Sequence, residues 1–345
     1  MSTDPTIDVV VPAFNEADHI EDCLDHILAQ DYPPDLVRVW VVDSGSSDET
    51  AAIVTARAER EPRLRLIGGA ERLNAGQAVN LGAAVGEAEL IARVDAHTYV
   101  APDYLRRAVE AFAAAEPDVA CVGGQPRQVG RTPFGVAVAV ARGSKLGVGG
   151  SIYADQRERA FVYTVQAGVY RRAVFESLGG FDPNIPYGED EELNWRLRDG
   201  GGRILLDTRL RFEYFTRSSW KALFRQYRNY GESRVRVVVA HREFLQPYHL
   251  APAALLLAFA SLTAAAPASR PARRGLAGLA VLYGGALLAG GAQAAGEADS
   301  APAPRVAAAI GAMHLGYGVG MLEGVANQLR ARARLGAPAA SVRPR

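Results

Sequence analysis

The stretch IARVDAH, residues 91–97, decides how the first half of this chain is interpreted. It is an apolar run that ends in a carboxylate, Asp95, and an imidazole, His97. A buried strand that ends in this way places two metal-capable groups at the rim of a sheet, where both can reach the same side if the chain turns. An isolated Asp-x-His is a weak signal, because a turn-capping Asp beside a surface His gives the same pattern.

Strand, loop and helix patterns alternate before this stretch. Short apolar runs at residues 7–12, 39–42 and 64–67 have the composition of buried strands, and helical spacing of apolar residues follows from residue 17 and around 81–85. Repeated units of this kind predict an α/β fold with a mostly parallel sheet and helices on both faces.

Polar residues follow the expected strands, and ligands bind at the carboxyl ends of such strands. The chain contains neither G-x-G-x-x-G nor G-x-x-x-x-G-K-[ST], so the usual dinucleotide and P-loop sites are unsupported. The polar loops carry Asn15, Glu16, Asp43, Ser44, Asn74, Gly76, Asp95 and His97.

A second acidic stretch, YGEDEELNWRL, occupies residues 187–197. Its four successive acids, residues 189–192, open an expected helix, where the helix dipole favours negative charge. A helix needs only one or two acids there, and four repel one another. We therefore expect at least one of them to serve chemistry.

Composition restricts the class of protein. The 345 residues carry 38 basic and 38 acidic side chains, which argues against a nucleic-acid protein that relies on bulk positive charge. The two cysteines, Cys23 and Cys121, are too few for a disulfide framework and fit a reducing cytosol. The first residues are short and polar rather than a secretory signal, so we expect the first domain to be cytoplasmic.

The C-terminal third has a different composition. Basic and aromatic residues interleave over 218–249, a pattern typical of short helices lying along an anionic membrane surface, with a solvated basic face as the alternative. Three Ala/Gly-rich apolar segments follow, at 250–267, 275–296 and 306–326. The last two have the length needed to span a bilayer, and a soluble helical domain is the alternative.

The charges between these segments favour two spans. Arginines follow the first and third segments, whereas Glu297 and Asp299 follow the second. If the segment 250–267 is re-entrant or interfacial, both Arg clusters are cytoplasmic, in agreement with the positive-inside tendency. The tail of residues 330–345 is then cytoplasmic too.

The chain resembles the family 2 glycosyltransferases, inverting enzymes of the GT-A fold. The motifs that carry the resemblance are VVPAFNE at 10–16, VVDSGSSDET at 41–50, NAG at 74–76, the Asp95 loop and GED at 188–190. Within the family it is most similar to the succinoglycan-type, membrane-attached glucosyltransferases, which share the Asp-Ala-His loop, the acidic helix and the QYRNYG stretch of residues 226–231.

The resemblance implies a Rossmann-like GT-A domain over 1–217. The residue patterns described above add amphipathic interface helices over 218–249, membrane-embedded helices over 250–329 and a basic tail over 330–345. The resemblance also implies a role for each matching residue. Asp43 reads uracil and ribose, Asp190 is the catalytic base and Glu189 orients it. The nucleotide-sugar site comprises Pro12, Ala13, Asn15, Glu16, Asp43, Asn74, Gly76, Arg93 and Asp95.

The resemblance further implies a divalent cation, Mn²⁺ or Mg²⁺, held by Asp95 and His97. His97 replaces the last carboxylate of the family's Asp-x-Asp motif, and because imidazole is the softer ligand we expect manganese to be favoured. Acceptor or diphosphate contacts are expected from Gln226, Arg228 and Tyr230. The frame from Gln226 lacks the Gln-x-x-Arg-Trp of many polymerising members, which disfavours processive synthesis.

The sequence therefore predicts transfer of one sugar from a UDP-sugar to a lipid-linked saccharide at the cytoplasmic face of the inner membrane. This activity belongs to exopolysaccharide or cell-envelope glycan assembly. The expected partners are the donor, the lipid-linked acceptor and membrane lipids, with no nucleic acid. The alternatives are a processive polysaccharide synthase, a polyprenyl-phosphate sugar synthase, or a membrane-attached binding or scaffold protein with a degenerate transferase domain.

Overall fold

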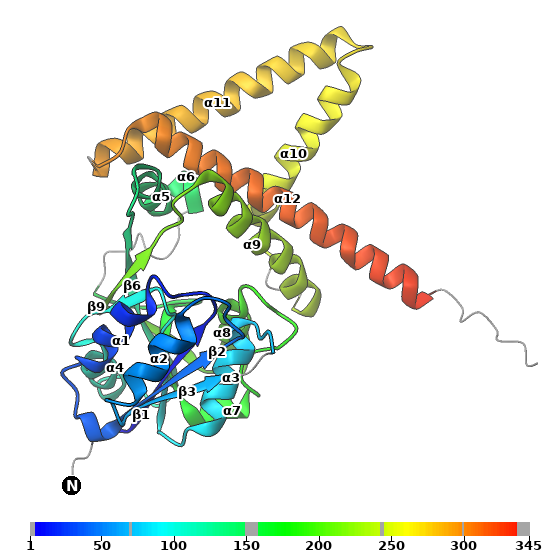
Figure 1. Ribbon diagram of the computed structural model, residues 1–345. Coiled ribbons are helices and arrows are strands. Elements are labelled where there is room, and N and C mark those ends of the chain that lie inside the picture. Colours follow the sequence, from blue (N-terminus) through cyan, green and yellow to red (C-terminus); the bar gives the residue numbers. More distant parts are fainter. Residues whose placement is uncertain (1–3, 69–70, 149–157, 242–244, 299, 337–345) are drawn as a thin grey trace, which may run out of the picture. The chain divides into compact units, whose positions relative to one another are not determined.

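The computed structural model of the chain describes residues 4–68, 71–148, 158–241, 245–298 and 300–336 (Figure 1). It divides into two compact units. The first consists of residues 1–131 and 150–216, and the second of residues 132–149 and 217–345.

The first unit alternates strands with helices. In chain order its elements are β1 (Ile7–Ala13), α1 (Ile20–Leu28), a 3-10 turn η1 (Pro34–Leu36), β2 (Val37–Asp43), α2 (Thr50–Ala58), β3 (Leu64–Gly68), α3 (Ala75–Val85), β4 (Leu90–Arg93), β5 (Thr98–Val100), α4 (Tyr104–Ala113), β6 (Val119–Val129), β7 (Arg159–Phe161), β8 (Gln166–Arg171), α7 (Arg172–Ser177), α8 (Glu189–Asp199) and β9 (Arg203–Phe215).

The strands form one sheet in the order β3-β2-β1-β4-β8-β6-β9-β5, with β7 paired to β9. The strands β1 to β4 are parallel to their neighbours within this group, as the sequence predicts. Beyond β4 the sheet is mixed, because β8, β5 and β7 pair antiparallel with their neighbours. Only residues 94–97 separate β4 from β5, too few for the crossover that parallel pairing needs, so β5 pairs with β9 instead.

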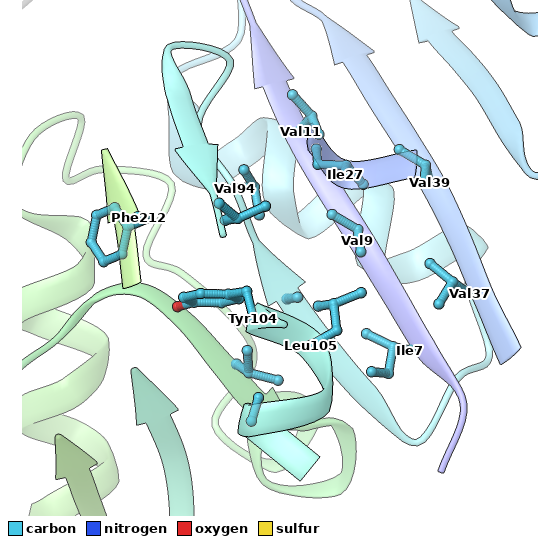
Figure 2. Packing of buried hydrophobic residues seen from close by; sticks show 14 of the residues in the cluster. Ile7, Val9, Val11, Ile27, Val37, Val39, Val94, Tyr104, Leu105 and Phe212 are labelled. Carbon is cyan, nitrogen blue, oxygen red and sulfur yellow. The ribbon is translucent and has the colours of Figure 1, made fainter. Parts of the chain in front are cut away.

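Helices cover both faces of this sheet because successive side chains of a strand point to opposite sides. Figure 2 shows Val9 and Val11 of β1 on the side of Ile27 from α1 and Leu105 from α4. Val10 belongs to the opposite cluster, with residues of α3, α7 and α8. Each buried aliphatic side chain of these two layers contributes roughly 1.5–3 kcal/mol, which fixes the strand ends in place.

The second unit is helical. It contains α5 (Pro133–Gly143), α6 (Lys145–Val148), α9 (Trp220–Ala240), α10 (Pro247–Ala265), α11 (Arg270–Ala298) and α12 (Ala303–Gly336). The sequence places residues 132–149 within the first domain. They join the C-terminal helices because Val138 of α5 is buried in the same cluster as Leu223 of α9 and Ile310 of α12.

The interface region expected over 218–249 as short helices contains one 21-residue helix, α9, which packs along α12. Glycines at every fourth position of α12 face it. A Cβ on Gly320 would collide with the backbone carbonyl of Arg228, and one on Gly324 would touch Val235 at 3.0 Å. Small residues at this spacing let two helix backbones approach closely.

Three helices among the described residues are long and apolar enough to cross a membrane, judged by length and composition. They are α10, α11 and residues 303–331 of α12. The segment expected to be re-entrant, 250–267, lies mainly in α10, which at 19 residues is itself long enough to cross. The expected tail begins within α12, and its last residues, 337–345, lie outside the described residues.

Candidate active site

The carboxyl ends of four parallel strands form one edge of the sheet in the first unit. Ala13 ends β1, Asp43 ends β2 and Arg93 ends β4. Ala13 lies opposite Asp43 in register, and Val10 lies opposite Arg93, so Asp43 and the residues after β4 flank the end of β1. This is the edge where ligands bind in α/β sheets.

The loops after β1 and β2 are bonded to each other. Asn15, at a left-handed φ of 53°, donates its backbone N–H to the Ser46 hydroxyl at 2.9 Å and accepts the backbone N–H of Ser47 at 2.8 Å. Ser46 in turn donates its hydroxyl to Asp43 at 2.5 Å. These contacts hold Asp43 and Asn15 in a preformed arrangement before any ligand arrives.

The end of β1 contributes backbone to this edge. The Ala13 carbonyl accepts the N–H of Ser44 at 2.9 Å, which continues the pairing of β1 with β2 past the last strand residue. Pro12 has no N–H to donate, which suits a strand at its end. The contacts that we expect between a nucleotide and Pro12 and Ala13 are therefore with backbone atoms and with the proline ring.

A buried guanidinium joins the two acidic stretches. Arg93 donates its Nε to Asp95 Oδ1 at 2.9 Å, and its Nη1 lies 2.8 Å from Glu189 Oε1. The second contact is an ion pair without hydrogen-bond alignment. Only 12% of the Arg93 side chain and 7% of the Glu189 side chain are exposed, so two carboxylates far apart in sequence share one desolvated cation.

The helix α8 presents Glu189 and Asp190 in its first turn. Gly188 precedes them at a φ of 73°, a left-handed conformation that glycine adopts without strain. Burial raises the pKa of Asp190 to about 6, although the positive charge of Arg93 opposes the rise. Burial likewise raises the pKa of Glu189. A carboxylate with this pKa is ionised at pH 7 and is a stronger base than an ordinary aspartate.

The other acids of the helix differ in their contacts. Glu192 is buried and holds Arg196 through both oxygens, at 2.6 and 2.7 Å. Arg196 also donates to the Gly180 carbonyl at 2.8 Å, which fixes the chain that leads into α8. Glu192 therefore stabilises the fold through its pair with Arg196. The repulsion among the four acids does not predict this pair.

His97 contacts a residue of the first loop. Its Nδ1 lies 3.0 Å from Glu16 Oε1, and its ring meets Tyr214 edge to face with centroids 5.6 Å apart. Burial favours the neutral ring, but the hydrogen bond to Glu16 and the charge interactions with Tyr214, Glu16 and Asp95 together outweigh it and raise the pKa of His97 to about 9. Glu16 thus touches the expected metal ligand.

Asn74 and Gly76 connect the edge to the chain before α8. Asn74 caps α3 in a reciprocal pair of 2.9 Å hydrogen bonds with Gln77, and its amide donates to the Pro183 carbonyl at 2.9 Å. A Cβ on Gly76 would meet Phe181 at 3.0 Å. Both residues therefore fix the position of the loop that leads into α8, whose first turn contains the catalytic candidates.

Arg72 is a residue of this edge that the sequence pattern does not single out. Its guanidinium lies 3.1 Å from the centre of the Phe14 ring, in the loop after β1. No local sequence signal links these two positions, because the contact exists only once β1 and the chain before α3 are folded together.

The expected acceptor or diphosphate contacts lie on α9, in the second unit. Arg228 pairs with Glu323 of α12 through both carboxylate oxygens, at 2.5 and 3.1 Å. Gln226 donates to the Tyr230 hydroxyl at 3.2 Å. Their role toward a substrate stays a prediction.

Asp95 and His97 offer a divalent cation one carboxylate and one imidazole. No group of three or more His, Cys, Asp or Glu side chains suited to a metal ion occurs in the part of the chain that the structure describes. Mg²⁺ and similar ions at phosphate sites commonly use one or two protein ligands together with substrate phosphates and water. The donor set therefore fits a cation that is held jointly with a diphosphate.

Comparison with known proteins identifies the family. The model of glycosyl transferase family 2 matches residues 8–179. The succinoglycan biosynthesis protein ExoA of Rhizobium meliloti is 32% identical over 261 residues, which cover 74% of this chain and 77% of that protein. The chain belongs to the family 2 glycosyltransferases. It is therefore a glycosyltransferase of polysaccharide or glycan biosynthesis.

Two further comparisons concern this family 2 glycosyltransferase. A Methanococcus voltae dolichyl N-acetyl-glucosaminyl phosphate diacetamido-dideoxy-glucuronosyltransferase is 26% identical, over 66% of this chain and 72% of that protein. The structure of the mannosyltransferase PcManGT from Pyrobaculum calidifontis, in complex with GDP-Man and Mn²⁺, aligns with a TM-score of 0.64 at 25% identity. The alignment covers 95% of this chain and 89% of that one and supports the GT-A fold.

Proposed function

We propose that this glycosyltransferase moves one sugar, with inversion, from a UDP-sugar to a lipid-linked saccharide. The observation that carries the proposal is the position of Arg93 between Asp95 and Glu189, beside Asp190. It brings a carboxylate suited to a diphosphate-bound cation and a carboxylate suited to proton transfer to one edge of the sheet.

The proposed chemistry needs one base. The hydroxyl of the acceptor attacks the anomeric carbon, its proton passes to an Asp190 oxygen, and the nucleoside diphosphate leaves from the opposite face. General-base catalysis of this kind contributes about 10²- to 10⁴-fold. Glu189 restricts the position of Asp190 through its own pairing with Arg93.

Asp95 and His97 are the residues that would hold a divalent cation, and manganese suits their mixed oxygen and nitrogen ligands. When bound, such an ion neutralises the charge that develops on the leaving diphosphate. The bound Mn²⁺ of the mannosyltransferase PcManGT supports this part of the proposal.

The proposed nucleotide pocket lies between the loops after β1 and β2 and the start of α3. Asp43 reads the uracil and ribose, while Pro12, Ala13, Asn15 and Glu16 line the pocket and Asn74, Gly76 and Arg93 lie beside the nucleotide. The GDP-Man in PcManGT makes a guanosine donor the competing possibility for this pocket.

The proposed location is the cytoplasmic face of the inner membrane, in exopolysaccharide or cell-envelope glycan assembly. The three apolar helices, which indicate membrane association, support it. In this proposal α11 and α12 span the bilayer and α10 enters one leaflet. Gln226, Arg228 and Tyr230 of α9, which packs along α12, approach the acceptor or the diphosphate.

The variant Asp190→Asn tests the proposed base. The amide is similar in shape but cannot accept the proton, so we expect turnover to fall by about 10²- to 10⁴-fold while the donor still binds. The measurements are UDP release in membranes supplied with several donors, and calorimetric binding of UDP with Mn²⁺.

Glu191→Gln serves as the matched control, because it makes the same change one position further along α8. We expect it to keep most of the turnover. Full turnover by Asp190→Asn would rule out the proposed base. Absence of transfer by the unaltered protein with every donor and membrane lipid extract would instead favour a binding protein.

A further inference from the structure

The hydrogen bond between Glu16 and His97 restricts what the imidazole can do. A carboxylate can only accept here, so the 3.0 Å contact places the proton of the ring on Nδ1. Among the described residues the structure gives no hydrogen-bond partner to Nε2. Nδ1 is therefore committed to Glu16, and Nε2 is the nitrogen that a cation can bind in place of a proton.

The residues around this pair hold it in one orientation. The backbone N–H of Glu16 donates to the Thr50 hydroxyl at 2.8 Å, and that hydroxyl donates to Asp48 at 2.5 Å. On the other side, the rings of His97 and Tyr214 pack edge to face. Only 18% of the His97 side chain and 21% of the Glu16 side chain are exposed, so neither rotates freely into solvent.

The replacement of a carboxylate by histidine at position 97 makes such support necessary. A carboxylate can offer either of two equivalent oxygens to a cation after rotation about one bond. An imidazole offers a single nitrogen along a single direction, and a histidine that binds a metal commonly donates its other N–H to a carboxylate that sets this direction.

We propose that Glu16 is a positioning residue that orients His97 toward the divalent cation, an inference that rests on the metal-dependent function proposed above. Through its bond to Thr50, Glu16 also ties the cation site to the loops after β1 and β2. Glu16, the last residue of the VVPAFNE motif, thus acts through His97, the last residue of the Asp-x-His motif.

Manganese binding by the full-length protein in detergent tests this role. The free Mn²⁺ signal in electron paramagnetic resonance gives the affinity in the presence of UDP, independently of sugar transfer. We expect Glu16→Ala to weaken Mn²⁺ binding about 10- to 100-fold. Glu16→Gln, which can keep an accepting oxygen near Nδ1, should lose much less.

A second background separates orientation of His97 from other roles of Glu16. In His97→Asp the ligand is a carboxylate and needs no partner on Nδ1, so adding Glu16→Ala should change Mn²⁺ affinity by less than about threefold, well below the loss expected with His97 present. Spin-echo modulation from an imidazole nitrogen should be present in the unaltered protein and absent in His97→Asp. Asp18→Asn removes an exposed charge from the same loop and should leave Mn²⁺ affinity unchanged.

Three results would overturn the inference. Equal losses on Glu16→Ala in both backgrounds would assign Glu16 to the nucleotide or to the fold, and unchanged Mn²⁺ affinity would remove the role altogether. If the unaltered protein binds no Mn²⁺ with UDP, the proposed metal dependence fails as well, which distinguishes that failure from one confined to Glu16. Thermal melting of each variant checks that it is folded.

Discussion

Arg93 is a permanent positive charge among acidic side chains. Burial disfavours its charged form, but Asp95, Glu189 and Asp190 together outweigh burial and raise the pKa of Arg93 above its ordinary value. Because the guanidinium stays charged, it limits how far burial can raise the pKa of Asp190. The same residue thereby sets the working range of the proposed base.

The pH dependence of transfer follows from Asp190. Its pKa of about 6 lies above the ordinary aspartate value, so the carboxylate needed to accept a proton is lost as the pH falls through that value. We expect kcat/KM to drop about tenfold per pH unit below about pH 6. Between about pH 7 and 8 the titration of Asp190 should leave kcat/KM unchanged. Initial rates of UDP release at constant ionic strength measure it, and a level profile down to about pH 5 would contradict the assignment.

Single residues were predictable where a motif carries them. The placing of Asp95 after a strand and of Asp190 in the first turn of a helix follows from local sequence, whereas their roles come from the family resemblance and stay predictions. The pairing of Arg93 with Glu189 and of His97 with Glu16 was not predictable, since each joins residues from distant segments that meet only in the folded sheet. The burial that raises the pKa of Asp190 arises in the same way.

At the scale of elements, the contact between α9 and α12 depends on the absence of side chains. Gly316, Gly320 and Gly324 of α12 lie where added Cβ atoms would meet α9. The ion pair between Arg228 and Glu323 lies along the same contact. The helix that carries the expected acceptor contacts is therefore positioned by close backbone packing.

Gly320→Ala should loosen this contact. The added methyl group collides with the Arg228 carbonyl, so the helices must separate, at a cost of about 1–3 kcal/mol. We expect a lower melting temperature in detergent. Gly284→Ala in α11 is the matched control, because its Cβ would meet nothing within 4 Å and alanine favours the helix. Equal melting of the two variants would refute the close contact.

Elements were predicted better than their pairing. The apolar runs of residues 7–12, 39–42 and 64–67 fall within β1, β2 and β3, since period and composition are local. The antiparallel entry of β8 between β4 and β6 has no local signal. Residues 133–143 read as an apolar stretch, and only the burial of Val138 beside α9 and α12 shows which unit they join.

At the scale of the whole molecule, the charges of the helical unit bear on its orientation in the membrane. Arginines follow α10 and lie in the last part of α12, whereas Glu297 is at the end of α11. With α11 and α12 as the spans, both arginine groups lie on the cytoplasmic side, as the positive-inside tendency favours. All three helices as spans would place both groups outside.

Thiol labelling in intact cells distinguishes these topologies. Cys23 and Cys121 are buried, so the unaltered protein should give little background. We expect an impermeant maleimide to label Ser300→Cys, which follows α11, and to label Ser341→Cys only after the membrane is opened. Labelling of Ser341→Cys in intact cells would exclude the two-span topology.

The course of residues 132–149 also determines how the catalytic part could be prepared without lipid. The chain passes between the units at three places, near residues 131, 149 and 216, so a stop codon after residue 216 severs just one of them. A fragment truncated there keeps Ala137, Val138 and Ala141 after losing the helices that cover them. Soluble expression therefore calls for replacing this internal excursion by a short polar linker as well as removing the C-terminal helices.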